Sequence, residues 1–253
     1  MNYKIYLALI AGLTQMPAYA EGTLGFTTGV DYSSGKYGQS EKTRITYVPL
    51  IAKYELDRWS FKAVVPWLRI DGPGGVSADS RINTGAVVTR RTVESGLGDV
   101  VLGATYSALM LNEPKFYMDI GAKVKLPTAS ESKGLGTGET DYTLSTDVYK
   151  TLDQLTLMGT LGYKVLGDPS GVNLNNVWFT SIGAVYKIDD QNSLGATMDL
   201  RQATTDQSTG LREYTVFYSH KFNETYKLQT YAVAGDTTSS VDYGAGAMLA
   251  ISW

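Results

Sequence analysis

The sequence contains one histidine and no cysteine, and this scarcity limits the chemistry that its side chains can carry. A serine nucleophile in a hydrolase needs a histidine base and an orienting carboxylate, so His220 would have to fill the role of base. His220 stands in the segment YSHKF, close to an expected tight turn, and shares the alternation of the apolar residues before it. No Gly-x-Ser-x-Gly motif is present. Common zinc sites also lack their ligands. We therefore expect no enzyme, no metal site and no cofactor.

Two glycine-rich segments invite a nucleotide-binding interpretation, and neither supports it. SGLGDV at 95–100 and GLGTGE at 134–139 lack the Gly-x-Gly-x-x-Gly spacing that is followed by a helix. We interpret both segments as turns and strand starts. The formal net charge is −3, from 22 Lys and Arg against 25 Asp and Glu, and it gives no sign of a nucleic-acid partner.

The segment 115–126, KFYMDIGAKVKL, has an apolar residue at every second position from Phe116 to Leu126. Lys115, Asp119, Lys123 and Lys125 lie between the apolar residues. A period of two predicts a β-strand with two unlike faces. In a soluble protein the apolar face would enter a core. In an outer-membrane barrel that face meets lipid, and the charges face an aqueous lumen.

A Lys or Arg on the lipid face near the midplane would cost about 2–4 kcal/mol, so we assign the charged faces to the interior. The resulting candidates for lumen-lining residues are Asp99, Lys115, Asp119, Lys123, Lys125, Asp147, Lys164, Asp199, Arg201, Glu213, Lys221, Lys227 and Asp242. Their mixed signs suggest ion pairs around a narrow water path. Two alternatives stay open, because such pairs could line a conducting pore or could fill and stiffen a closed barrel.

The alternating pattern recurs along the chain and predicts twelve strands. We expect them near 22–33, 42–56, 58–71, 97–109, 114–127, 139–151, 154–167, 176–188, 192–203, 211–222, 225–236 and 240–253. A tilted strand of about twelve residues crosses a bilayer, whereas strands of soluble proteins usually have about five or six. Short turns alternate with longer connections, as in an up-and-down barrel with its turns in the periplasm. Pro49 and Pro66 interrupt two strands, where we expect bulges.

The longest expected connection, 72–96, carries Arg81, Arg90 and Arg91. Connections of this length are often functional or mobile. We favour a surface loop or a strand extension over a lid that folds into the mouth of the barrel.

The two ends of the chain point to export. Residues 1–20 have a positive Lys4, a short apolar run and an Ala18-Tyr19-Ala20 cleavage site, which predicts a cleavable signal peptide. The sequence has no apolar run long enough for a transmembrane helix. Residues 21–253 are then expected to form the barrel. At the C-terminus, the residues that share one face of the last strand include Tyr243, Leu249, Ile251 and Trp253. This ending resembles the membrane-assembly signature of bacterial outer-membrane barrels, and it implies the barrel-assembly machinery as a partner.

Two further segments resemble a known family. SGLGDVVLGATY at 95–106 resembles the Gly-Leu-Gly-Asp strand start of the family named for the MetA pathway of phenol degradation. The segment 123–150, with its Lys-x-Pro-Thr, Gly-x-Gly and Asp141-Tyr142, is similar to a second block of that family. The resemblance implies an outer-membrane barrel that passes small hydrophobic or aromatic compounds. The resemblance identifies Gly96, Gly98 and Asp99 as positions of the family's motif, and it assigns no role to them.

We therefore expect an all-β, antiparallel, up-and-down transmembrane barrel in the outer membrane of a Gram-negative cell. Its expected function is that of a porin-like channel for passive transport of small solutes, with aromatic compounds as the leading hypothesis on the resemblance alone. The alternatives are a channel for polar or charged solutes and a non-conducting structural or surface-binding barrel. The expected partners are outer-membrane lipid and a small-molecule solute, and no nucleic acid.

Overall fold

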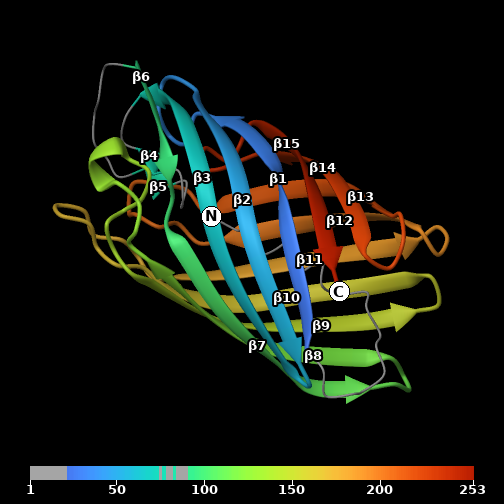
Figure 1. Cartoon of the computed structure of the whole chain (residues 1–253). Helices are drawn as coiled ribbons and strands as arrows, with labels where there is room; N and C mark the ends of the chain where they lie inside the picture. Colours follow the sequence, from blue (N-terminus) through green and yellow to red (C-terminus); the bar gives the residue numbers. More distant parts are fainter. Residues whose placement is uncertain (1–21, 74–75, 78–81, 84–90) are drawn as a thin grey trace.

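The computed structural model describes residues 22–73, 76–77, 82–83 and 91–253. These residues form an antiparallel barrel in which the first strands and the middle strands cross obliquely (Figure 1). The strands are β1 (Thr23–Gly35), β2 (Thr43–Leu56), β3 (Trp59–Pro73), β4 (Val76–Ser77), β5 (Ile82–Asn83), β6 (Arg91–Leu97), β7 (Val100–Leu111), β8 (Phe116–Leu126), β9 (Asp141–Leu152), β10 (Leu155–Val165), β11 (Val177–Lys187), β12 (Asn192–Arg201), β13 (Leu211–Lys221), β14 (Tyr226–Gly235) and β15 (Tyr243–Ser252). A short 3-10 helix, η1 (Glu131–Lys133), lies between β8 and β9. Within the described ranges, no helix is long and apolar enough to span a membrane.

The barrel closes where β1 pairs with β15. In the described part of the chain, thirteen strands join the sheet, and β4 and β5 form a separate pair. Since β6 and β7 both pair with β3, one after the other, they share one position in the wall. The expected twelve-stranded up-and-down barrel is therefore confirmed. The predicted signal peptide, residues 1–20, lies outside the described residues.

Residues 91–97 lie in strand β6, although we expected residues 91–96 in a long connection. Their register with β3 runs from the pair Pro73–Arg91 to the pair Trp67–Leu97. The Nε of Arg91 donates to the carboxylate of Asp71 at 2.6 Å, which ties the two strands together at their ends. The described part of this connection is thus a strand extension, one of the two forms that we favoured. Arg81 and Arg90 lie outside the described residues.

The expected bulge at Pro49 is wrong, whereas the ladder at Pro66 is irregular on one of its two sides. The two prolines lie opposite each other in an uninterrupted register between β2 and β3. On the other side, the β1–β2 register continues past Pro49 without a shift, from Thr28–Leu50 to Asp31–Tyr47. Proline removes one backbone donor, and at Pro49 the ladder absorbs that loss without an extra residue. At Pro66 the other side of β3 does carry one, because two residues of β3 face three of the partner between the pairs Val64–Val101 and Trp67–Leu97.

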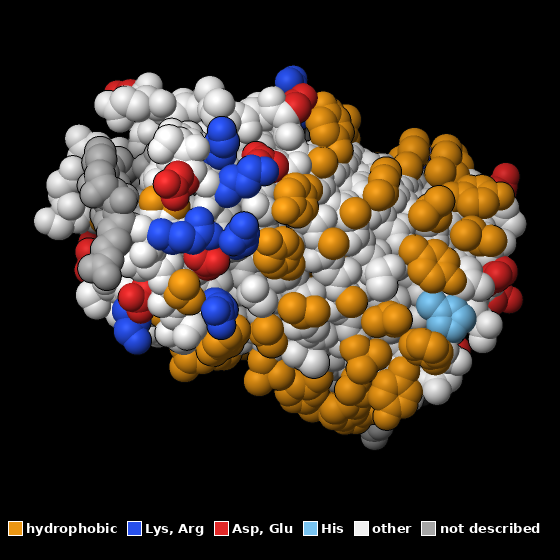
Figure 2. All heavy atoms as spheres, turned by 90° about the horizontal axis from the view of Figure 1, so that it is seen from above, with side chains coloured by type: hydrophobic (Ala, Val, Ile, Leu, Met, Phe, Trp, Pro, Cys, Tyr) orange, Lys and Arg blue, Asp and Glu red, His pale blue; other side chains and the backbone are white. Residues whose placement is uncertain are grey.

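In β8 and β13 the side chains alternate between an exposed, mostly apolar outer face and a mostly polar inner face. In β8, Ile120 is 44% exposed whereas Lys125 is 7% exposed. In β13, Tyr214 and Val216 are exposed whereas Glu213 is buried. Figure 2 shows hydrophobic side chains spread over the outer wall, with Lys and Arg gathered toward one end of the same face. The outer wall is therefore the apolar belt that a lipid environment requires.

The connections sort by length onto the two ends of the barrel. Tight turns at 57–58, 112–115, 153–154, 188–191 and 222–225 lie at one end, here called the turn end. Longer connections at 36–42, 127–140, 166–176, 202–210 and 236–242, and the partly described one between β3 and β6, lie at the other, the loop end. Asp57 and Asp153 adopt positive φ angles of 52° and 51° in two of the turns, a conformation that Asp tolerates better than most residues.

Candidate functional site

Aromatic rings fill part of the interior where glycines face inward. A Cβ atom on Gly195 would lie 2.1 Å from the ring of Phe217, and one on Gly246 would lie 2.4 Å from the ring of Tyr231. The two aromatic residues form a buried cluster with Val185 and Met248. The hydroxyl group of Tyr231 donates to Asp31 at 2.7 Å across this space. Glycine is needed at these positions because each ring lies against the strand.

The inner faces of β2 and β3 form an apolar wall. Its buried residues are Ile45, Tyr47, Pro49 and Ile51 on β2, and Val64, Pro66, Leu68 and Ile70 on β3. Sequence reasoning missed this wall because both faces of the two strands are apolar; Leu50 and Val65, for example, point outward and are exposed. The period-two signal therefore could not tell the inner face from the outer one.

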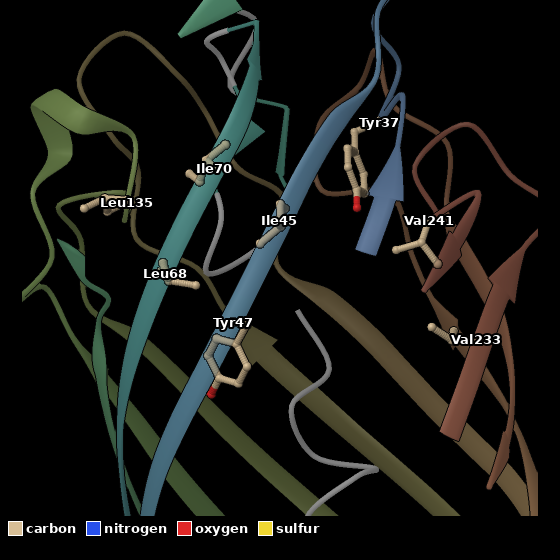
Figure 3. Close-up of a cluster of buried hydrophobic side chains, with 8 residues drawn as sticks. All are labelled: Tyr37, Ile45, Tyr47, Leu68, Ile70, Leu135, Val233 and Val241. Carbon is tan, nitrogen blue, oxygen red and sulfur yellow. The ribbon is translucent and has the colours of Figure 1, made fainter. Parts of the chain in front are cut away.

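A cluster of apolar residues reaches across the interior near the loop end. This apolar cluster consists of Tyr37, Ile45, Tyr47, Leu68, Ile70, Leu135, Val233 and Val241. Figure 3 shows that β2 and β3 supply the centre, that Leu135 enters from the loop between β8 and β9, and that Val233 and Val241 come from the opposite side. Leu68 is fully buried. The cluster thus joins walls that are far apart in the sequence.

The break between β6 and β7 is bound by the loop between β8 and β9. The carboxylate of Asp99 accepts the backbone N–H of Ala129 at 2.8 Å. The hydroxyl group of Thr128 donates to the carbonyl oxygen of Gly98 at 3.2 Å and accepts the N–H of Val100 at 2.9 Å. These bonds satisfy backbone groups on both sides of the interruption, and they fix the start of the loop.

Beside this break lies an ion cluster of Asp99, Lys125, Asp141 and Lys164. The Nζ of Lys125 lies 3.4 Å from Asp99 and 3.2 Å from Asp141, and it donates to the hydroxyl group of Thr137 at 2.8 Å. Lys164 reaches Asp141 at 2.7 Å. The carboxylates of Asp99 and Asp141 are almost fully buried. The cluster therefore ties β7, β8, β9 and β10 together on the inside.

Glycine is required where the loop and the break approach each other. A Cβ atom on Gly98 would lie 2.6 Å from Leu68, one on Gly136 would lie 2.6 Å from Asp99, and one on Gly96 would lie 2.9 Å from Leu135. The motif positions Gly96, Gly98 and Asp99 thus meet residues of the second block, 123–150, in one place. Both blocks are recognisable in the sequence by resemblance, yet nothing in their spacing indicates that they touch.

The other predicted charged residues lie at several levels of the barrel. Asp199 and Glu213 are buried and directly opposite each other on β12 and β13, and Arg201 is buried on β12. Asp119, Lys123 and Asp147 are partly accessible on the inner faces of β8 and β9. The remaining predicted residues lie near the two ends of the barrel. Lys115 is exposed in a turn, Lys221 forms a 2.6 Å ion pair with Glu224 at the turn end, Lys227 is half-buried at the start of β14, and Asp242 pairs with Lys42 at 2.8 Å at the loop end.

The C-terminal residues close the barrel. Trp253 exchanges two backbone hydrogen bonds of 3.0 Å with Leu24, and its ring stacks on Phe26 at a centroid distance of 5.6 Å. Tyr243 and Trp253 are exposed on the outer wall, and Leu249 and Ile251 are half-buried between them. An assembly role for these residues stays a prediction.

The turn end holds His220 in a local hydrogen-bond network. Its Nδ1 lies 2.8 Å from the side-chain oxygen of Asn192, which also accepts the hydroxyl group of Tyr218. The side-chain amide of Asn192 in turn donates to Asp189 at 2.8 Å, and the backbone N–H of Gln191 does the same at 2.8 Å. These bonds hold the pKa of the Asp189 carboxyl below its usual value. In the described part of the chain, no group of three potential metal ligands is found.

The model of one family matches residues 25–246, almost the whole barrel: the family described as Putative MetA-pathway of phenol degradation. The chain belongs to this family. No curated protein matches the sequence.

Solved structures with the same fold include an outer membrane channel from Pseudomonas putida F1, with 14% identity, a TM-score of 0.68, and coverage of 96% of this chain and 98% of that one. The NanC porin has 11% identity, a TM-score of 0.58, and coverage of 90% and 98%. The KdgM porin in complex with disordered oligogalacturonate has 8% identity, a TM-score of 0.55, and coverage of 91% and 98%. At these identities the likeness establishes the fold, which is that of outer-membrane barrels.

Proposed function

We propose that this family member is a channel in the outer membrane of a Gram-negative cell, through which small hydrophobic or aromatic compounds pass passively. The observation that carries the proposal is the apolar cluster inside the barrel. A general channel for polar solutes keeps its interior polar and wet. Here Tyr47, Leu68 and their neighbours replace water near the loop end, where solutes would enter. Apolar compounds gain from contact with such a surface, whereas hydrated ions lose their water there.

The family and the apolar outer belt support this location and this class of protein. The loop end would then face outward and the turn end would face the periplasm. The channel would be surrounded by outer-membrane lipid, would be inserted by the barrel-assembly machinery after loss of residues 1–20, and would have no catalytic role. We further propose that the partly accessible Asp119, Lys123 and Asp147 line the water path.

Two other functions have support from specific observations. The charges inside the barrel favour a path for polar or charged solutes. The fully buried Leu68 and the ion cluster favour a barrel that does not conduct. Conductance of the refolded protein separates these alternatives from the proposal.

The decisive experiment measures two fluxes through proteoliposomes that carry lipopolysaccharide in their outer leaflet. We expect the protein to speed the entry of toluene and to admit arabinose slowly. The double variant Tyr47→Ala/Leu68→Ala should raise arabinose entry and ionic conductance several-fold because it removes the centre of the apolar cluster. The matched control is Leu50→Ala, on the outer face of the same strand, which should leave both fluxes unchanged.

Zero flux of both solutes, together with zero conductance, would remove the channel and leave the binding barrel. Fast arabinose entry in the unmodified protein would instead favour the polar channel. Growth on limiting phenolic compounds, with and without the gene, tests the aromatic class in the cell. Equal growth would contradict it.

A further inference from the structure

A row of lysines crosses the inner face of the barrel on the turn side of the apolar wall. Lys53 on β2 lies opposite Lys62 on β3, Lys62 lies opposite Gly103 on β7, and Gly103 lies opposite Lys123 on β8. A Cβ atom on Gly103 would lie only 3.1 Å from the side chain of Lys123. The stem of Lys123 therefore extends over the glycine toward Lys62, since no side chain separates them.

Lys62 and Lys123 differ from the other interior cations in their pairing. Lys53 forms a 2.6 Å ion pair with Glu55, and Lys125 belongs to the ion cluster. Within the described residues, Lys62 and Lys123 form no ion pair, and both are partly accessible. The ammonium groups of Lys53 and Lys123 repel that of Lys62. Two neighbouring ammonium groups without an acceptor provide up to six donors for an anion.

Glu55 is paired with Lys53, and the interior carboxylates of Asp119 and Asp147 already have neutral donors. Asp147 accepts the hydroxyl group of Thr160 at 2.5 Å, and Asp119 accepts that of Ser107. They lie closer to the turn end, four residues along β8 and β9 from the row that contains Lys123. The charge of Asp147 attracts Lys62 and Lys123 without an ion pair. The carboxylates thus offset part of the positive charge without forming ion pairs with Lys62 or Lys123.

The apolar wall ends at this row. On the inner face of β2, Ile51 precedes Lys53, and on that of β3, Val64 follows Lys62. Ile51 and Val64 are both buried, and the registers of the two strands place the lysines side by side beneath them. A solute at this level would meet an apolar surface on one side and ammonium groups on the other. Sites with this arrangement orient a ligand that has an apolar body and one charged end.

We propose that Lys62 and Lys123 form a binding site for the carboxylate of a small aromatic acid, whose ring lies against Ile51 and Val64. The proposal rests on the channel function, and it narrows the solute from aromatic compounds in general to their anions. Lys53 contributes to the local field while it stays bound to Glu55.

The test uses the refolded full barrel in planar bilayers, with benzoate, benzyl alcohol and benzylamine as probes of similar size that differ in charge. We expect benzoate to block the KCl current at a concentration at least about tenfold lower than either other probe. The double variant Lys62→Met/Lys123→Met should lose this preference and should also lower the chloride-to-potassium permeability ratio at least about twofold. Lys187→Met, an exposed lysine at the turn end, is the control and should behave as the unmodified protein does.

The same experiment distinguishes failure of the site from failure of the channel. A conducting barrel that benzoate blocks no better than benzyl alcohol, or less well than benzylamine, overturns the site and leaves the channel. A barrel that does not conduct overturns the channel, and saturation-transfer NMR of benzoate with the detergent-solubilised barrel then decides the site. Binding that disappears in the double variant supports it, and absence of binding to the unmodified protein overturns it. Heat-dependent gel mobility verifies that each variant is folded.

Discussion

At the scale of single residues, Lys125 has the strongest structural role inside the barrel. It contacts two carboxylates that water hardly reaches, those of Asp99 and Asp141. A buried charge that loses its partner costs about 3–5 kcal/mol. We expect Lys125→Met to lower the free energy of unfolding by this amount, as measured by urea unfolding from lipid vesicles.

Lys164→Met is the matched comparison for Lys125→Met. It removes one of the two lysines at Asp141 and leaves Lys125 in place. Its effect should therefore be clearly smaller. Equal stability of the Lys125→Met variant and the unmodified protein would show that the ion cluster does not stabilise the barrel.

Ile120 and Lys123 test the two faces of β8. Ile120→Lys places a charge on the exposed apolar face, at a cost of about 2–4 kcal/mol near the midplane, and should impair assembly in lipid vesicles. Lys123→Leu should fold, because its face is inside, and should instead change ion selectivity. If both variants fold equally well, the assigned orientation of the strand is wrong.

At the scale of strands, the inward glycines make room for aromatic rings. Gly195→Ala would bring a methyl group to 2.1 Å from the ring of Phe217, and such overpacking typically costs about 1–3 kcal/mol. Gly159→Ala on β10 is the control, since its Cβ atom would have an ordinary contact of 3.4 Å with Val148. We expect urea unfolding to show a loss only for Gly195→Ala. A comparable loss at both positions would show that contact with the ring is not the cause.

The turn between β11 and β12 should weaken in acid. Hydrogen bonds from Asn192 and Gln191 favour the charged carboxylate of Asp189, so its pKa in the folded protein lies below that in the unfolded chain. The stabilisation is present above the unfolded pKa of about 3.9 and is lost as the pH falls through the lower folded value. Amide exchange of Gln191 and Asn192 should therefore accelerate in this acidic range. Asp189→Ala should remove the pH dependence, and a retained dependence would assign it to another group.

The strands were predictable because their alternation is local, but the candidate site depends on register. The sequence KFYMDIGAKVKL indicates two faces by itself, and Ile120 and Lys125 follow it. β2 and β3 carry apolar residues on both faces, so the inner wall could not be identified. The meeting of Asp99 with Lys125 and Asp141 joins three strands, and no spacing within one segment encodes it. β6 was foreseen only as one of two alternatives, a strand extension, and its strand partner in the described residues is the far end of β3.

At the scale of the whole molecule, the interior has two regions of different character. The loop end contains the apolar cluster and the ion cluster, both tightly packed. Toward the turn end, Lys62, Lys123, Asp119 and Asp147 remain partly accessible. Passage from outside would therefore begin with desolvation against apolar side chains and would continue past fixed charges. This order favours solutes that combine an apolar body with a single charge.

The pairing of β1 with β15 also has a consequence for the rate at which the protein folds. The other pairs of adjacent wall strands join segments that are consecutive in the chain or, for β3 and β7, separated only by the connection that contains β6, whereas this pair joins Leu24 to Trp253. Closing a longer loop costs more entropy, and contacts that are distant in sequence slow folding. We expect removal of Ser252 and Trp253 to slow refolding into lipid vesicles. The rate of refolding is measured by heat-dependent gel mobility. The control is Trp253→Phe, which keeps the main-chain bonds to Leu24 and should fold nearly as fast as the unmodified chain. If the truncated chain also folds at an unchanged rate, an earlier step limits folding. A sheet in which β1 and β15 have not yet paired is open and has two unpaired edges, where a strand of another molecule could add.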